Sequence, residues 1–201
     1  MSEPIEFFFD FVSPYGYIAS ERIEAIAAKA GRKVVWRPIL LGAVFKVSGA
    51  QPLTNLPPIK SDYARHDFER SARQVGLAFK LPPGFPHATV GAARCFYWAE
   101  EKDATKAADF VHRCYRAYFA QGRDISKNDI VAEVAGEAGF SRDEALAGMN
   151  DQRIKDRLKA AVDDAIARGV FGSPFIVIGK EGFWGSDRLE QVAEWLRRGG
   201  W

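Results

Sequence analysis

The chain has little cysteine, with only Cys95 and Cys114 among its 201 residues. Two thiols are too few for the disulfide frameworks that hold small secreted domains together. Nothing near the start has the composition of a signal peptide, because Glu3, Glu6 and Asp10 interrupt any apolar run. These features predict a cytoplasmic protein whose thiols stay reduced and buried.

The chain also lacks long apolar runs and an excess of charge of either sign. No stretch approaches the roughly 20 apolar residues that a membrane-spanning helix needs. The 28 basic and 26 acidic residues leave a net charge of +2, and no basic block stands out. We therefore predict neither a nucleic-acid nor a membrane partner. Aromatic residues, at 13%, are plentiful and suit a sizeable core or an apolar pocket.

The stretch FFFDFVSPYGY, residues 7–17, organises the chain. The apolar run Ile5 to Phe9 predicts a buried strand that ends at Asp10, and Pro14 suits the first position of a following helix. Ser13 is therefore expected where the strand meets the N-terminus of the helix. Unpaired N–H groups and the helix dipole make such a position favourable for an anion. Taken alone, however, a Ser-Pro pair of this kind is most often just a helix cap.

Strand and helix patterns then alternate in a way that defines an insertion. Residues 33–41 predict a second strand, and residues 42–58 are interpreted as a long loop. From residue 59 to about 169 the spacing of apolar residues is helical throughout, with capping patterns that begin at Ser126 and Ser141. This central part is expected to contain no strand.

The last thirty residues return to strand patterns. Phe175 begins a strand, the sequence GKEG at residues 179–182 predicts a hairpin turn, and Phe183-Trp184 forms a short partner strand. Ser186 is expected to cap the final helix. If the chain follows a thioredoxin plan, the Gly-x-Pro sequence before the first of these strands predicts a cis bond between Ser173 and Pro174.

This order of elements predicts an α/β, thioredoxin-like fold. Residues 1–42 and 170–201 would form a four-stranded mixed sheet with its flanking helices, and residues 43–169 a linker loop and a large all-helical insertion. Thioredoxin-type proteins carry Cys-x-x-Cys where the first strand meets the first helix. Here those four residues are Ser-Pro-Tyr-Gly, residues 13–16. Disulfide exchange at this position is therefore excluded, since no thiol is present.

Three separated motifs resemble one enzyme family. They are FFFDFVSPYGYIAS at the start, TNLPP at residues 54–58, and GVFGSPFIVIGKEGFWGSDRLEQV at residues 169–192. In this order, spread over the whole chain, they resemble the kappa class of glutathione transferases and, more closely, the bacterial 2-hydroxychromene-2-carboxylate isomerases. The resemblance implies a DsbA-like thioredoxin fold with a helical insertion.

The resemblance also implies glutathione as cofactor and no metal. Ser13 would contact the glutathione sulfur and stabilise the thiolate through its hydroxyl. The usual residue before the cis-proline of the family is Val, where this chain has Ser173. The implied glutathione-binding residues are Ser13, Asn55, Ser173, Pro174, Trp184, Ser186 and Asp187.

The activity implied is conversion of a 2-hydroxychromene-2-carboxylate to a trans-o-hydroxybenzylidenepyruvate in the degradation of aromatic compounds, by a homodimer. A kappa-like transferase acting on small electrophiles would use the same residues, and a non-catalytic thioredoxin-fold binding protein is a third reading. This chain departs from the isomerases at two places. Phe45, followed by Lys46, replaces a lysine, and Ala88 or Thr89 replaces a tyrosine.

Overall fold

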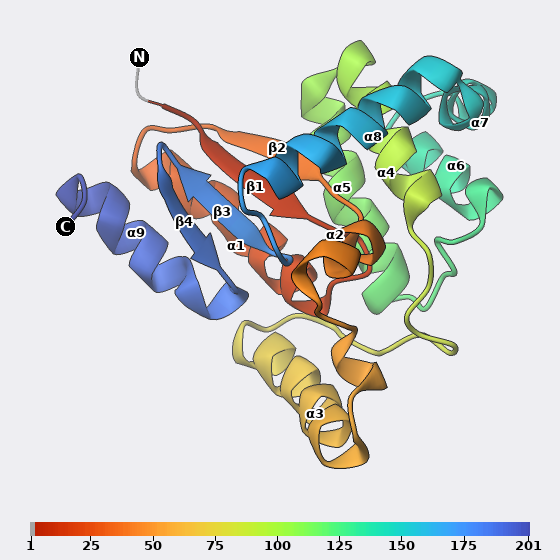
Figure 1. Cartoon of the computed structure of the whole chain (residues 1–201). Coiled ribbons are helices and arrows are strands. Elements are labelled where there is room, and N and C mark those ends of the chain that lie inside the picture. Colours follow the sequence, from red (N-terminus) through yellow and green to blue (C-terminus); the bar gives the residue numbers. More distant parts are fainter. Residues whose placement is uncertain (1–2) are drawn as a thin grey trace.

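A mixed sheet of four strands forms the centre of the computed structural model, which describes residues 3–201. The strands are β1 (Ile5–Phe9), β2 (Val34–Pro38), β3 (Phe175–Ile178) and β4 (Glu181–Trp184). Their order is β2-β1-β3-β4, with β1 parallel to β2 and antiparallel to β3. The predicted thioredoxin-like fold is confirmed, and Figure 1 shows that strands from both ends of the chain build the one sheet.

Helices fill the chain between and around these strands. Helix α1 (Pro14–Lys29) joins β1 to β2, and η2 (Ser186–Arg188) and α9 (Leu189–Arg198) follow β4. Between β2 and β3 lie α2 (Leu41–Ser48), η1 (Leu53–Asn55), α3 (Pro58–Gln74), α4 (Val90–Lys102), α5 (Ala104–Phe119), α6 (Asn128–Glu137), α7 (Arg142–Asn150) and α8 (Gln152–Ala167). The structure describes every residue from 59 to 169 and assigns no strand there, which confirms the all-helical insertion. No helix within residues 3–201 has the length and apolarity to cross a membrane.

Aromatic side chains join the sheet to the insertion. On β1, Phe7 and Phe9 are fully buried and lie edge-on to Trp36 of β2. Phe9 also meets Phe96 of α4 and Tyr115 of α5. The aromatic-rich composition therefore supplies one continuous core, and α4 and α5 fix the position of the strand that leads to Ser13.

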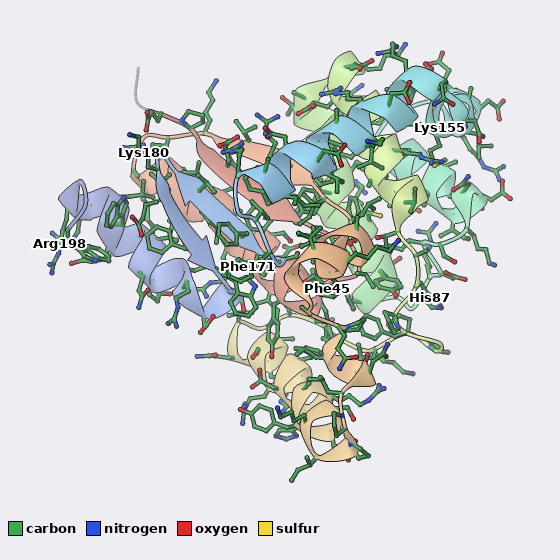
Figure 2. All side chains as sticks on the ribbon, in the orientation of Figure 1. Phe45, His87, Lys155, Phe171, Lys180 and Arg198 are labelled. Carbon is green, nitrogen blue, oxygen red and sulfur yellow. The ribbon has the colours of Figure 1, made fainter. Side chains whose placement is uncertain are left out.

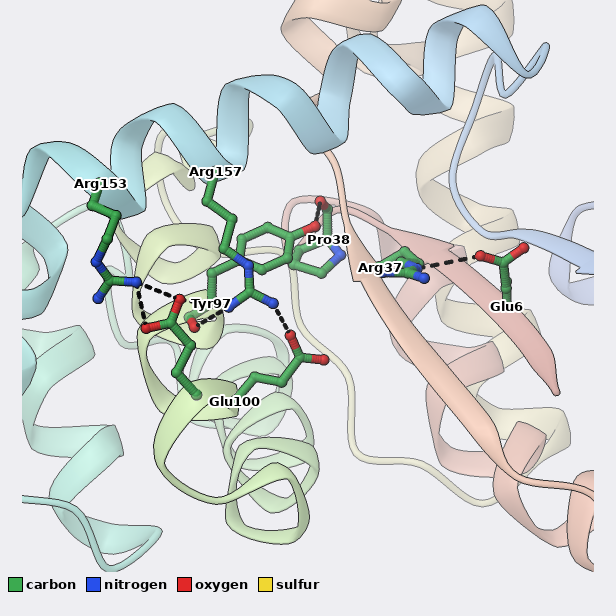
Figure 3. Close-up of polar contacts among 8 residues, drawn as sticks. Glu6, Arg37, Pro38, Tyr97, Glu100, Arg153 and Arg157 are labelled. Carbon is green, nitrogen blue, oxygen red and sulfur yellow. Dashed lines mark hydrogen bonds and ion pairs between the residues drawn. The ribbon is translucent and has the colours of Figure 1, made fainter.

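Ion pairs join two helices of the insertion, and a hydrogen bond joins them to the sheet (Figure 3). Arg157 of α8 pairs with Glu100 and Glu101 of α4, and its guanidinium lies 4.7 Å from the centre of the Tyr97 ring. The Tyr97 hydroxyl in turn donates to the carbonyl of Pro38 at the end of β2, over 3.1 Å. This chain of contacts links α8 through α4 to the strand beside the candidate site.

Three local predictions were wrong. Residues 42–58 are not simply a loop, since α2 occupies 41–48 and η1 occupies 53–55. Ser186 does not cap the final helix, because it opens the 3₁₀ turn η2 and makes no side-chain cap bond. Ser126 bonds to Asp124 instead of capping α6, whereas the Ser141 hydroxyl does accept the amide of Glu144 as predicted.

Candidate functional site

A cavity of about 1450 Å³ opens where β1 ends and α1 begins. Its walls come from five parts of the chain: the turn before α1, the segment from the end of β2 through η1, helix α3, the segment before α4, and the two connections that flank β3 and β4. Residues far apart in sequence, such as Ser13 and Ser173, therefore face one space. Figure 2 labels two of the lining residues, Phe45 on α2 and Phe171 before β3.

Ser13 sits at the N-terminus of α1, as predicted, and it is almost entirely buried. Its Oγ accepts the amide of Gly16 over 3.0 Å, which is a cap bond, and its hydroxyl donates to the carbonyl of Ser173 over 2.8 Å. The serine therefore caps the helix and also touches the residue before the cis-proline. Capping the helix does not exclude a role at the cavity, because the same hydroxyl makes both contacts and Ser13 lines the cavity.

Gly16 makes this close arrangement possible. A Cβ at Gly16 would lie 2.5 Å from the hydroxyl oxygen of Tyr115, 3.0 Å from the Cβ of Ser13 and 3.1 Å from the Oγ of Ser173. The Tyr115 hydroxyl donates to the carbonyl of Asp10 over 2.9 Å. Only a residue without a side chain leaves these groups in contact around the first turn of α1.

The cis peptide predicted between Ser173 and Pro174 is present. The Oγ of Ser173 accepts the amide of Asp10 over 2.9 Å, and the carbonyl of Pro174 accepts the amide of Gly185 over 3.1 Å. The turn before β3 is thus held from both sides, by the end of β1 and by the end of β4. Ser173 lines the cavity, while Pro174 is buried just behind it.

Asp10 is a site residue that sequence reasoning missed. Its buried carboxylate accepts the amide of Val12 at 3.1 Å, the hydroxyl of Thr89 at 2.5 Å and the amide of Leu41 at 2.7 Å. Burial raises the pKa of this carboxyl, and the three donors oppose that rise. The available signal was an acidic residue directly after the three consecutive phenylalanines of β1, a position where a solvated carboxylate is not expected.

Three further predicted residues, Trp184, Ser186 and Asp187, line the cavity at and after the end of β4. The indole of Trp184 lies over Gly172, where a Cβ would come within 2.3 Å of its Nε1, and the ring also meets Phe171 edge-on. Beyond it the chain turns at Gly185, whose φ of +112° is accessible to glycine. This turn brings Ser186 and Asp187 to the cavity.

Apolar side chains form the opposite wall. Its lining includes Val12, Leu41, Phe45, Leu53, Phe68, Phe85 and Val90. Lys46 adds a positive charge at the exposed end of α2. His87 also lines the cavity. Its imidazole lies beside Tyr118 and Asp124, two residues that are not part of the cavity lining. The imidazole of His87 is therefore bound into the loop before α4.

The structure thus gathers Ser13, Ser173, Trp184, Ser186 and Asp187 around one cavity, with Pro174 behind Ser173. Asn55 is the exception. It lies in η1, exposed, and the neighbouring Leu53 lines the cavity in its place. Phe45, Lys46, Ala88 and Thr89 all reach the wall, but the Thr89 hydroxyl is engaged by Asp10. The two cysteines are buried, and burial raises the pKa of each thiol.

Comparisons with known proteins agree with this geometry. The family model of the DsbA-like thioredoxin domain matches residues 4–197. The chain is 28% identical to glutathione S-transferase kappa 2 of Caenorhabditis elegans, over 96% of this chain and 91% of that protein. It is 27% identical to a 2-hydroxychromene-2-carboxylate isomerase of Sphingobium xenophagum, over 98% and 99%. A solved structure of a 2-hydroxychromene-2-carboxylate isomerase superimposes with a TM-score of 0.86 at 26% identity, covering 98% of this chain and 95% of that one.

Proposed function

Because the chain belongs to the DsbA-like thioredoxin domain family, we propose that it is a glutathione-dependent isomerase acting on 2-hydroxychromene-2-carboxylate-type compounds. The observation that carries the proposal is the convergence of three groups on one large cavity. These are the Ser13 helix terminus, the cis-proline turn at Ser173, and the turn that carries Asp187. An apolar wall leaves room for a second, aromatic molecule beside them.

The residues present fit glutathione. The carbonyl of Ser173 precedes β3 and lies outside the sheet ladder, so it can accept an amide of a peptide-like ligand. Asp187 offers a carboxylate to the γ-glutamyl amino group, with Ser186 beside it and Trp184 covering the cavity edge. Asn55 is assigned to the same ligand from the family motif, and its exposed side chain is free to turn toward a bound molecule.

In this proposal, bound glutathione supplies a thiolate that can add reversibly to a conjugated substrate. Ser13 lies where its hydroxyl and the N-terminus of α1 both favour a negative sulfur over a thiol. At present its hydrogen goes to the Ser173 carbonyl. If an amide of the ligand donates to the Ser173 carbonyl in place of Ser13, the Ser13 hydroxyl can donate its hydrogen to the sulfur instead. The wall that carries Leu41, Phe45 and Val90 would hold the aromatic part of the substrate and exclude water.

Calorimetric titration with glutathione tests the first half of the proposal. Measurable binding that is weakened by Asp187→Ala is the expected result. No binding would favour the non-catalytic thioredoxin-fold protein instead.

Product analysis tests the second half. The purified protein with glutathione should isomerise a panel of chromene carboxylates without consuming glutathione. If a glutathione adduct with small electrophiles accumulates and no isomerisation occurs, the result would favour a kappa-like transferase. Relatives of the chain include proteins named glutathione S-transferase kappa.

We also expect a cytoplasmic homodimer. Exposed apolar side chains occur on α2, where Val47 is 69% exposed, and on one face of α3, where Ile59 and Tyr63 are 83% and 62% exposed. Figure 1 shows α3 projecting from the body, so a second copy could cover this face. Light scattering should give twice the mass of the chain, and Ile59→Asp together with Tyr63→Asp should give a monomer. A wild-type monomer would contradict the expectation.

A further inference from the structure

The Ser173 hydroxyl has a hydrogen with no partner. Its oxygen accepts the amide of Asp10 over 2.9 Å, so one lone pair is used and the hydroxyl is held in place. No group within residues 3–201 accepts the hydrogen of this hydroxyl, although Ser173 is half-buried and lines the cavity. A hydroxyl that is held in place and has an unused hydrogen can donate that hydrogen to an acceptor that comes within reach.

The position of that hydroxyl is next to Ser13. A Cβ built on Gly16 would lie 3.0 Å from the Cβ of Ser13 and 3.1 Å from the Oγ of Ser173. Both serine side chains therefore converge on the first turn of α1, where the helix N-terminus favours an anion. Two serine side chains from different parts of the chain therefore lie at the helix terminus where the glutathione sulfur is proposed to bind.

The two hydroxyls differ in their present partners. Ser13 donates its hydrogen to the carbonyl of Ser173 and must release that bond before it can donate to a ligand. Ser173 needs no such change. A valine in place of Ser173 would fill a similar volume but would offer no hydrogen, so the second donor is a property of this chain's own sequence.

We propose that Ser173 is a second catalytic residue, whose hydroxyl donates a hydrogen bond to the glutathione sulfur and, together with Ser13, stabilises the thiolate. This inference rests on the function proposed above. The thiol proton leaves to solvent, and Ser173 itself stays protonated. Its contribution is to lower the pKa of the bound thiol below the value that Ser13 alone would give.

The test compares Ser173→Val with Ser173→Thr, two variants of nearly equal shape that differ in the hydroxyl. The absorbance of the thiolate in bound glutathione is followed against pH in both variants and in the wild type. Losing one hydrogen bond to an anion should raise the pKa of the bound thiol by about one to two pH units in Ser173→Val. Ser173→Thr should titrate close to the wild type.

A purely structural Ser173 would give a different pattern. Losing the bond from the Asp10 amide would lower the melting temperature of Ser173→Val while leaving the thiol titration unchanged, and that result would overturn the inference. Ser173→Ala, which makes less steric demand, replaces the valine variant if the latter fails to fold. Ser13→Ala separates the two proposals: a raised thiol pKa there, with no change in Ser173→Val, leaves the proposed function standing and removes only the role of Ser173. Failure of the wild type to bind glutathione would overturn both.

Discussion

Ser13 is the residue on which the proposed chemistry depends most. Ser13→Ala removes one hydrogen bond to the proposed thiolate, a loss of about 1.5–3 kcal/mol, which corresponds to roughly a tenfold to hundredfold lower rate. It also removes the cap bond to Gly16, so the free energy of unfolding should fall by about 1 kcal/mol. Steady-state rates and thermal melts measure the two effects separately. An unchanged rate with reduced stability would mean that Ser13 serves only as a helix cap.

Gly16 controls the packing behind the site. In Gly16→Ala the new Cβ would collide with the Tyr115 hydroxyl, which is fully buried and bound to the carbonyl of Asp10. Such overpacking should lower the free energy of unfolding by about 1–3 kcal/mol. Gly42→Ala is the matched control, since nothing lies within 4 Å of a Cβ there and alanine favours the helix. Chemical denaturation gives the free energy of unfolding of both variants. Equal values would contradict the expected collision between a Cβ at Gly16 and the Tyr115 hydroxyl.

At the scale of elements, one carboxylate organises the starts of two helices. The N-cap residues of α2 and α4 are Leu40 and Thr89, and neither makes a side-chain cap bond within its own helix. Instead Asp10 accepts the first amide of α2, from Leu41, and the hydroxyl of Thr89. The two helices that carry much of the apolar wall are therefore fastened to the turn that carries Ser13.

Asp10→Asn tests this junction. An amide keeps the size of the side chain but offers one oxygen and places an NH₂ group against existing donors, so buried bonds are lost at a cost of about 1–3 kcal/mol. Thr89→Val removes one of the three bonds and should have a smaller effect. Hydrogen exchange should show the amides at the start of α2 losing protection in Asp10→Asn. Unchanged protection there would contradict a capping role across elements.

At the scale of the whole molecule, His112 joins the first helix to the insertion. It lies on α5 between Glu21 and Glu24 of α1, and Trp36 of β2 meets its ring edge-on. Burial lowers the pKa of this imidazole, but the hydrogen bond to Glu24 and the negative charges of both glutamates outweigh burial and raise the pKa to about 9. The charged histidine is thus favoured in the folded state.

This raised pKa sets the direction of a pH effect. The contribution of protonated His112 to the free energy of unfolding is fully present below the unfolded pKa of about 6.5. It is lost as the pH rises through the folded pKa of about 9. The wild type should lose up to about 3 kcal/mol over that range, and His112→Gln should lose much less. His66→Gln, on the exposed side of α3, is the control and should keep the wild-type slope. Parallel slopes in wild type and His112→Gln, measured by denaturation at several pH values, would refute the assignment.

The sheet, the position of Ser13 and the helical nature of the insertion could all be predicted from the amino-acid sequence. These follow from local signals: apolar runs of strand length, helical spacing of apolar residues, and proline at a strand-to-helix junction. The Gly-x-Pro pattern likewise pointed to the cis bond at Ser173. Each such signal is contained in a few neighbouring residues, so it can be read without knowing what packs against them.

Features that depend on partners far away in the chain could not be predicted and became known from the folded structure. Helix α2 was missed because the group that accepts its first amide is Asp10, 31 residues earlier in the chain. The unused hydrogen of Ser173 became visible only once Asp10 and Gly16 were placed beside it, across more than 150 residues of chain. Hydrogen-bond partners of this kind are fixed by how the sheet and the insertion fold together. No local pattern encodes them.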